Sequence, residues 1–200
     1  MRKYIIVLFS MVLMGVILFN YLPKNKKAFA YKLLVNPEIN VDSSQLKPIN
    51  KKVLKTAHLQ GKKISPTYQS AVCTEYVIGV LSKLTAIDQK TKQKIRIITN
   101  NDLDSLFNHD APVLKGVVKA LVDCGIGEEV DINEAKPGDF VQFWDNSYGF
   151  LFGHCGILRG FDGSKTLMSL YSSAPSTNGH GIQTYIVTKK TYFVRLKRLI

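Results

Sequence analysis

The stretch Ser70-Ala71-Val72-Cys73-Thr74-Glu75-Tyr76-Val77 places a cysteine where a helix is predicted to begin. Apolar residues recur behind it at helical spacing, at Val77, Val80, Leu81 and Leu84. Because Ser70 is a suitable N-cap, the pattern predicts a helix over 70–83 with Cys73 at its third position. Unpaired N–H groups and the helix dipole stabilise a thiolate at such a place. The alternative is a buried, unreactive cysteine, since cysteine packs as a small apolar residue.

A histidine in a predicted strand gives this cysteine a candidate partner. His154 lies in Gly153-His154-Cys155-Gly156-Ile157-Leu158, 81 residues after Cys73 (154 − 73 = 81). Strand alternation turns Cys155 to the opposite face from His154, so Cys155 is predicted to pack and not to act as a second nucleophile. A thiolate attacks a carbonyl, while an imidazole serves as base and then as acid toward the leaving amine. The pair therefore predicts acyl transfer through a thioester.

The composition fits one domain with an N-terminal appendage. The 200 residues are 46% hydrophobic and carry a net charge of +12. The cations are spread along the chain without an arginine-rich block or an aromatic RNA-binding signature. We therefore expect a polyanionic neighbour such as membrane lipid or cell-wall polymer, and no nucleic acid. The three cysteines, at 73, 124 and 155, lack metal-ligand spacing, so neither a metal nor another cofactor is predicted. Cys124 and Cys155 either pair or remain two buried thiols, and the thiols are favoured.

The N-terminus contains a predicted membrane segment. Met1-Arg2-Lys3 precedes an apolar run of 19 residues, 4–22, which is long enough to cross a bilayer as a helix. The run exceeds the apolar core of a cleaved signal, roughly 7–15 residues, and this favours a retained anchor. Ala28-Phe29-Ala30 offers the alternative, cleavage after Ala30 and release as a secreted protein. In both cases the remainder is predicted to be exported and to face the periplasm or the cell wall.

The chain divides into a segment 1–22, a lysine-rich stalk over 23–60 with a short helix near 51–58, and a domain over 61–200. Within this domain we expect a β-rich segment at 95–98, a short helix capped by Asn101, and a helix from Asp110 that Gly125 stops. The remaining pattern predicts strands at 140–144, 153–158, 166–172, 181–187 and 192–199. Helices followed by an antiparallel sheet predict an α+β fold. His58 is predicted to be solvated and His109 to lie in a loop.

Three blocks carry a resemblance to a known family. They are Cys73-Thr74-Glu75-Tyr76-Val77, Lys136-Pro137-Gly138-Asp139-Phe140-Val141-Gln142-Phe143-Trp144, and Gly153–Leu158. In this order they resemble the NlpC-type cell-wall cysteine peptidases of the papain-like superfamily, over about residues 66–187. The resemblance implies a papain-like fold, with the Cys73 helix packed on the antiparallel sheet and His154 as the base. It also implies the substrate, an amide bond in peptidoglycan or a related cell-wall peptide. Compared with the family, residues near 85–110 form an insertion.

The resemblance assigns the third polar residue of the site to Ser173. The family's block, a run such as His-Ala-Pro-Ser-Thr, matches Ser173-Ala174-Pro175-Ser176-Thr177. A serine hydroxyl can accept an imidazole N–H and fix its tautomer. Tyr171 is the substitute candidate, and Asn178 and His180 follow in the next turn. These three are also predicted to line the substrate site, although turns by themselves favour residues such as Asn178.

Two other functions stay open on the sequence. One is an acyltransferase of the same fold acting on lipid or protein, and the other is a non-catalytic cell-wall-binding module with a structural cysteine. A reactive thiol separates the binding module from both enzymes, because thiolate character serves chemistry and not packing. Tyr68 and Gln69, just before the nucleophile, are candidate donors to an oxyanion.

Overall fold

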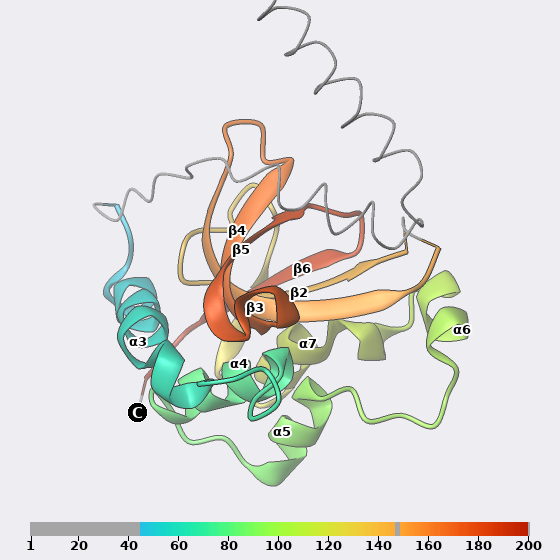
Figure 1. Cartoon of the computed structure of the whole chain (residues 1–200), viewed down its shortest axis with the longest axis horizontal. Coiled ribbons are helices and arrows are strands. Elements are labelled where there is room, and N and C mark those ends of the chain that lie inside the picture. The colour runs from blue at the N-terminus through green and yellow to red at the C-terminus, as the bar shows by residue number, and fades with distance from the viewer. Residues whose placement is uncertain (1–44, 147–148, 200) are drawn as a thin grey trace, which may run out of the picture.

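The computed structural model describes residues 45–146 and 149–199, in which helices precede an antiparallel sheet (Figure 1). The helices are α3 (Pro48–Ile64), α4 (Cys73–Ser82), α5 (Gln89–Ile95), α6 (Leu103–Asn108), the 3-10 helix η1 (Pro112–Lys115) and α7 (Gly116–Asp123). The strands are β1 (Gly127–Val130), β2 (Phe140–Asp145), β3 (Phe152–Phe161), β4 (Leu167–Ala174), β5 (Gly179–Ile186) and β6 (Thr191–Leu196), with a 3-10 turn η2 (Pro175–Thr177) before β5. The predicted α+β class is confirmed, and the five strands expected beyond residue 140 are present.

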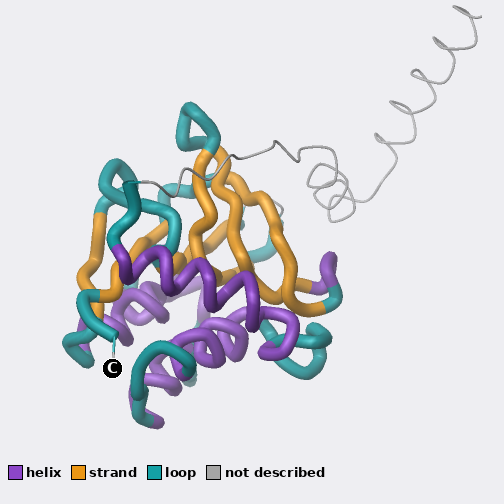
Figure 2. Tube along the Cα trace, turned by 90° about the vertical axis from the view of Figure 1, so that its left-hand side faces the viewer, coloured by secondary structure: helices purple, strands orange, loops and turns teal. Residues whose placement is uncertain are grey.

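The sheet has six strands in the order β1-β6-β2-β3-β4-β5, and neighbouring strands are antiparallel. Strands β2 to β5 pair in succession, whereas β6 returns to the other side of β2. This makes β2 an interior strand, and all of its residues are buried. In β3 the pairing with β4 shifts register between Leu158 and Gly160, which marks a bulge. The helices gather on one side of the sheet (Figure 2).

Two apolar clusters lie on the two faces of the sheet. The helix-side cluster joins α3, α4 and α7 to the sheet and includes Cys155, Ile157 and Tyr171. The opposite cluster includes Phe143, Leu158 and Tyr185, and the segment between β1 and β2 contributes Ala135 to it. Successive residues of β3 therefore enter different clusters, as the alternation of a strand requires. This alternation sends Cys155 and His154 to different faces.

Helix α3 differs from the predicted stalk. Residues 48–64 form a helix of 17 residues, and Val53 and Ala57 on it are buried in the helix-side cluster. The lysines that suggested a stalk lie on its exposed side, at Lys51, Lys52, Lys55, Lys62 and Lys63. The folded unit thus begins before residue 61. The predicted anchor over 1–22 lies outside the described residues. In residues 45–146 and 149–199 we find no helix long and apolar enough to cross a membrane.

Between residues 95 and 125 one local prediction is wrong, and two predicted helices are present with a different cap or start. The expected β-rich segment at 95–98 contains the end of α5, and Ile97 has a left-handed backbone with φ 53°. Helix α6 is capped by Asp102, whose side chain accepts from the Ser105 N–H at 2.8 Å, and not by Asn101. The helix expected from Asp110 is a 3-10 turn followed by α7. Gly125, with φ 73°, follows the end of α7 as predicted.

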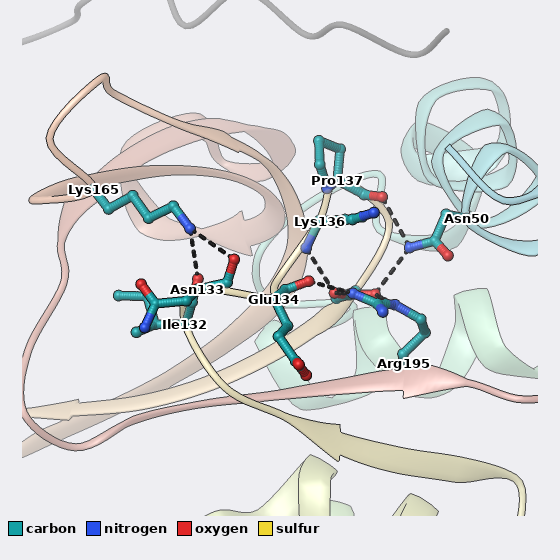
Figure 3. A network of polar contacts seen from close by, with 9 residues as sticks. Asn50, Ile132, Asn133, Glu134, Lys136, Pro137, Lys165 and Arg195 are labelled. Carbon is teal, nitrogen blue, oxygen red and sulfur yellow. Dashed lines mark hydrogen bonds and ion pairs between the residues drawn. The ribbon is translucent and has the colours of Figure 1, made fainter. Parts of the chain in front are cut away.

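The turn before β2 ties α3 to the sheet (Figure 3). The buried Asp139 carboxylate accepts hydrogen bonds from Arg195 Nε at 2.9 Å and Nη2 at 2.7 Å, from Asn50 Nδ2 at 2.9 Å and from the Lys136 N–H at 2.8 Å. Gly138, with φ 92°, admits the close approach of Asn50, because a Cβ there would lie 2.6 Å from the Asn50 carbonyl oxygen. The Pro-Gly-Asp block on which the resemblance partly rests therefore has a structural role in this chain.

Candidate active site

Cys73 is the first residue of α4 and not its third. Val72 occupies the N-cap position without a side-chain cap, and the helical ladder begins with the Tyr76 N–H donating to the Val72 carbonyl at 2.9 Å. Ser70, the expected cap, instead donates from its hydroxyl to the Thr67 carbonyl at 2.8 Å in the preceding turn. The N–H of Cys73 precedes the ladder, so it is available at the positive end of the helix.

The Cys73 sulfur lies against two consecutive residues of β3. The Cys155 thiol and backbone N–H and the His154 ring are the groups whose hydrogen bonding acts on its pKa. The pKa of Cys73 is lowered to about 4, and hydrogen bonding from the Cys155 thiol is the largest cause. Partial burial raises this pKa, whereas hydrogen bonding from His154 and the charge of His154 lower it further. Hydrogen bonding to the Cys73 sulfur, together with complete burial, raises the pKa of Cys155 well above its ordinary value. Cys155 therefore packs as predicted and is also a donor to the candidate nucleophile.

The three cysteines are free thiols. Cys124 and Cys155 therefore do not form a disulfide bond, which was one of the two alternatives that the sequence left open. Cys155 is buried as expected, but Cys124 is exposed, and its sulfur donates to the Leu121 carbonyl at 3.5 Å. Cys124 thus provides an ordinary surface thiol with which Cys73 can be compared.

A directed chain of hydrogen bonds holds the His154 ring. Its Nε2 lies 2.6 Å from Ser172 Oγ, and the Ser172 hydroxyl donates to Gln183 Oε1 at 2.8 Å. Gln183 Nε2 donates to Thr177 Oγ1 at 2.7 Å, and the Thr177 hydroxyl donates to the Gly179 carbonyl at 2.6 Å. Each hydroxyl has one proton to give, so Ser172 accepts from His154 Nε2–H. With Nε2 held in this way, Nδ1 is the ring nitrogen that is left to exchange a proton with Cys73.

Two aromatic rings flank the His154 imidazole. The Phe143 ring meets it nearly edge-on at a centroid distance of 5.8 Å, and the Tyr185 ring lies at 5.0 Å. Both aromatic residues are buried in the cluster on the far face of the sheet. With the Ser172 contact, this packing restricts the imidazole to the orientation that its tautomer requires.

Ser173 does not make the contact assigned to it. It neighbours Ser172 on β4 and points to the other face, where its hydroxyl donates to the Ala71 carbonyl and lies 2.9 Å from Ser65 Oγ. Ser65 Oγ is also 2.9 Å from the Ala71 carbonyl oxygen. Ser173 therefore fixes the loop that leads into Cys73, whereas Ser172 orients His154. The sequence interpretation selected the wrong one of two adjacent serines.

Tyr171 and His180, predicted to line the substrate site, pack between α3 and the sheet instead. Their rings stack at a centroid distance of 5.7 Å, and the other side of His180 meets Tyr76 at 5.3 Å. The Tyr171 hydroxyl lies 3.3 Å from Nδ1 of His58, so His58 is exposed yet has a partner. Burial is the main cause that lowers the pKa of His180. These rings support α3, and the geometry gives them no contact with Cys73.

Asn178 and Tyr68 lie beside the nucleophile loop. Asn178 is exposed, and its Oδ1 accepts from the Tyr68 N–H at 3.4 Å. Burial, and then the negative charge of Cys73, raise the pKa of Tyr68, so its hydroxyl stays protonated. Gln69, the other candidate oxyanion donor, is exposed.

The chain matches no protein-family model, no curated protein and no solved structure in the comparisons made. What the site can do therefore follows from its own geometry. A thiolate at a helix start, an imidazole in a fixed tautomer and nearby neutral donors are the parts that nucleophilic acyl transfer requires.

Proposed function

We propose that this protein is a cysteine hydrolase that cleaves an amide bond through a thioester, with Cys73 as nucleophile and His154 as base. The observation that carries the proposal is the Cys73 sulfur at the start of α4, with its pKa lowered to about 4 beside an imidazole that Ser172 orients. A stabilised thiolate next to an oriented imidazole favours an enzyme over a wall-binding module, since packing needs neither.

The proposed reaction has two halves. The Cys73 thiolate adds to the carbonyl carbon, and the resulting oxyanion accepts from the Cys73 N–H at the helix start and from the Tyr68 hydroxyl. The His154 imidazolium then gives its proton to the leaving nitrogen, and the C–N bond breaks to leave a thioester. Water attacks the thioester as His154 takes its proton, and the C–S bond breaks, which releases the acid and restores the thiolate–imidazolium pair.

We infer a cell-wall peptide as the substrate from the resemblance to NlpC-type peptidases, whose three blocks include both Cys73 and His154. The net charge of +12 favours an acidic polymer as the neighbour of this protein. An exported protein, held at the membrane by residues 4–22, would act on peptidoglycan that lies close to the bilayer. Asn178, exposed beside Tyr68, is the predicted substrate-site residue that this arrangement retains.

Mass analysis of fragments released from purified peptidoglycan tests the function. The full chain should release fragments with a new amino group on one product and a new carboxyl group on the other, and Cys73→Ala should release none. An acyltransferase would yield fragments joined to an added amine or alcohol in place of the free acid. Fragments that appear equally with Cys73→Ala would exclude Cys73 as the nucleophile.

The role of Ser172 can be separated from that of Ser173. We expect Ser172→Ala to lower kcat by roughly ten- to hundredfold with little change in KM, because a hydrogen bond to a charged group contributes about 1.5–3 kcal/mol. The pH profile of kcat should also move, since the His154 tautomer is no longer fixed. Ser173→Ala is the matched variant on the adjacent residue, and it should mainly lower stability. A larger loss of kcat in Ser173→Ala than in Ser172→Ala would reverse the assignment.

A further inference from the structure

A pocket of about 440 Å³ lies between α5 and α7, and none of its lining residues belongs to the proposed catalytic site. Its walls combine three lysines with three apolar residues: Lys90, Lys94, Lys119, Ile97, Ile98 and Val113. Small-molecule sites have volumes of about 300–1,000 Å³, so the pocket is large enough to hold a ligand. Helix α5 belongs to the segment near 85–110 that the resemblance identifies as an insertion.

The lining of this pocket is positively charged. Lys94 and Lys119 share a single carboxylate, that of Asp123, with Lys119 Nζ 3.2 Å from its Oδ2. Lys90 comes from the first turn of α5, near Asp88, whose carboxylate caps the helix by accepting from the Thr91 N–H at 2.7 Å. The lining contains three cations and no acid, and the adjacent carboxylates are shared or already engaged. An anionic group is therefore the complementary occupant.

The apolar wall is exposed and its backbone is strained. Ile98 is 68% exposed, so its apolar surface is available to a ligand in the pocket. Ile97 has φ 53°, a conformation that β-branched residues rarely adopt. Gly116 leaves room for Ile97, because a Cβ there would lie 2.8 Å from its Cδ1. Strain that the surrounding packing maintains is concentrated at ligand sites, so the wall is consistent with a binding role.

We propose that this pocket binds a small phosphate ester that has an apolar portion. The phosphate meets Lys90, Lys94 and Lys119, and the apolar portion lies on Ile97, Ile98 and Val113. The same chemistry occurs in soluble phosphate monoesters and in the headgroup region of a phospholipid. The inference is independent of the cysteine chemistry, since it uses none of the residues of the proposed catalytic site.

Calorimetric titration of the full chain in a neutral detergent tests the site with phenyl phosphate as the probe. Inorganic phosphate and benzyl alcohol serve as probes of the anionic part and of an aromatic part alone. We expect phenyl phosphate to bind about tenfold more tightly than inorganic phosphate, because its ring is removed from water. Benzyl alcohol should not bind measurably. If dihexanoyl phosphatidylglycerol displaces phenyl phosphate, the natural ligand is a phospholipid. If it does not, the natural ligand is a soluble phosphate ester.

Four variants locate the binding. Lys90→Gln should weaken phenyl phosphate and inorganic phosphate alike, by about fivefold. Ile98→Ser should weaken phenyl phosphate by about fivefold and leave inorganic phosphate unchanged. Asp123→Asn should tighten both by about two- to fivefold, since Lys94 and Lys119 lose their shared carboxylate. Lys63→Gln, an exposed lysine in the last turn of α3, is the control and should change neither.

Two results would overturn the proposal. One is phenyl phosphate binding no tighter than inorganic phosphate, which would reduce the pocket to a general attraction of anions by surface lysines. The other is tight binding of phenyl phosphate that neither Lys90→Gln nor Ile98→Ser weakens, which would place the ligand elsewhere on the protein.

Discussion

Replacing Cys73 with alanine is expected to reduce the proposed amide cleavage by about 10⁴-fold or more, since the variant lacks the atom that would form the thioester. His154→Ala should cause a loss of similar size, because the thiolate then lacks both its imidazolium partner and the acid for the leaving amine. The two residues act as one unit, so the double variant should be little worse than either single one. Rates of release of new amino groups, measured side by side for the three variants, check this.

Cys124→Ala is the matched control for this series. It removes an exposed thiol from a residue that contacts the Leu121 carbonyl, and it should leave the rate unchanged. If Cys73→Ala kept a tenth or more of the wild-type rate, or if the losses in Cys73→Ala and His154→Ala simply multiplied in the double variant, the two residues would not form a nucleophile–base pair.

Asp139→Ala is expected to lower the free energy of unfolding by about 3–5 kcal/mol, the range for breaking a buried ion pair from one side. The variant leaves Arg195 and Asn50 buried, at 8% and 2% exposure, without the carboxylate that both contact. Urea unfolding followed by fluorescence measures the change. Trp144 is the sole tryptophan, and it is buried on the neighbouring strand β2 with Nε1 donating to the Leu114 carbonyl at 2.8 Å.

Glu129→Gln serves as the control for the ion pair. Glu129 pairs with Lys115 at the surface at 2.6 Å, and its loss should change the free energy of unfolding by at most about 1 kcal/mol. An Asp139→Ala protein as stable as Glu129→Gln, but without activity, would mean that the Pro-Gly-Asp block serves the chemistry directly.

Cys73 and His154 could be located from the sequence because each is marked by a local pattern. The apolar spacing after Cys73 predicts α4, and the strand around His154 follows from its Gly-rich boundaries and apolar run. The exact start of α4 could not be predicted, because Thr67 engages Ser70 in a turn and leaves Val72 at the N-cap. The sequence shows that Ser70 is able to cap a helix, but local hydrogen bonds such as the one from its hydroxyl to Thr67 compete with capping.

The error between Ser172 and Ser173 has a different cause. A strand presents alternate residues to opposite faces, so a shift of one residue in register exchanges the two serines. Register between β3 and β4 depends on the bulge between Leu158 and Gly160, a tertiary feature that no residue in the Ser173–Thr177 run encodes. The prediction of a stalk over 23–60 missed helix α3 because it relied on composition. The lysines of α3 dominate its composition, and only the packed structure shows that Val53 and Ala57 enter the core.

The rate of iodoacetamide alkylation of Cys73 between pH 3 and pH 9 tests the central claim most directly, with peptide mapping to resolve Cys124 as the internal reference. The account predicts that Cys73 labels rapidly down to about pH 5 and loses reactivity as its thiolate is protonated with a midpoint near its pKa of about 4. Cys155→Val and His154→Ala should each move that midpoint upward, because each removes a hydrogen bond that stabilises the thiolate. A midpoint for Cys73 that coincides with that of Cys124 and stays unchanged in His154→Ala would contradict the thiolate–imidazole site.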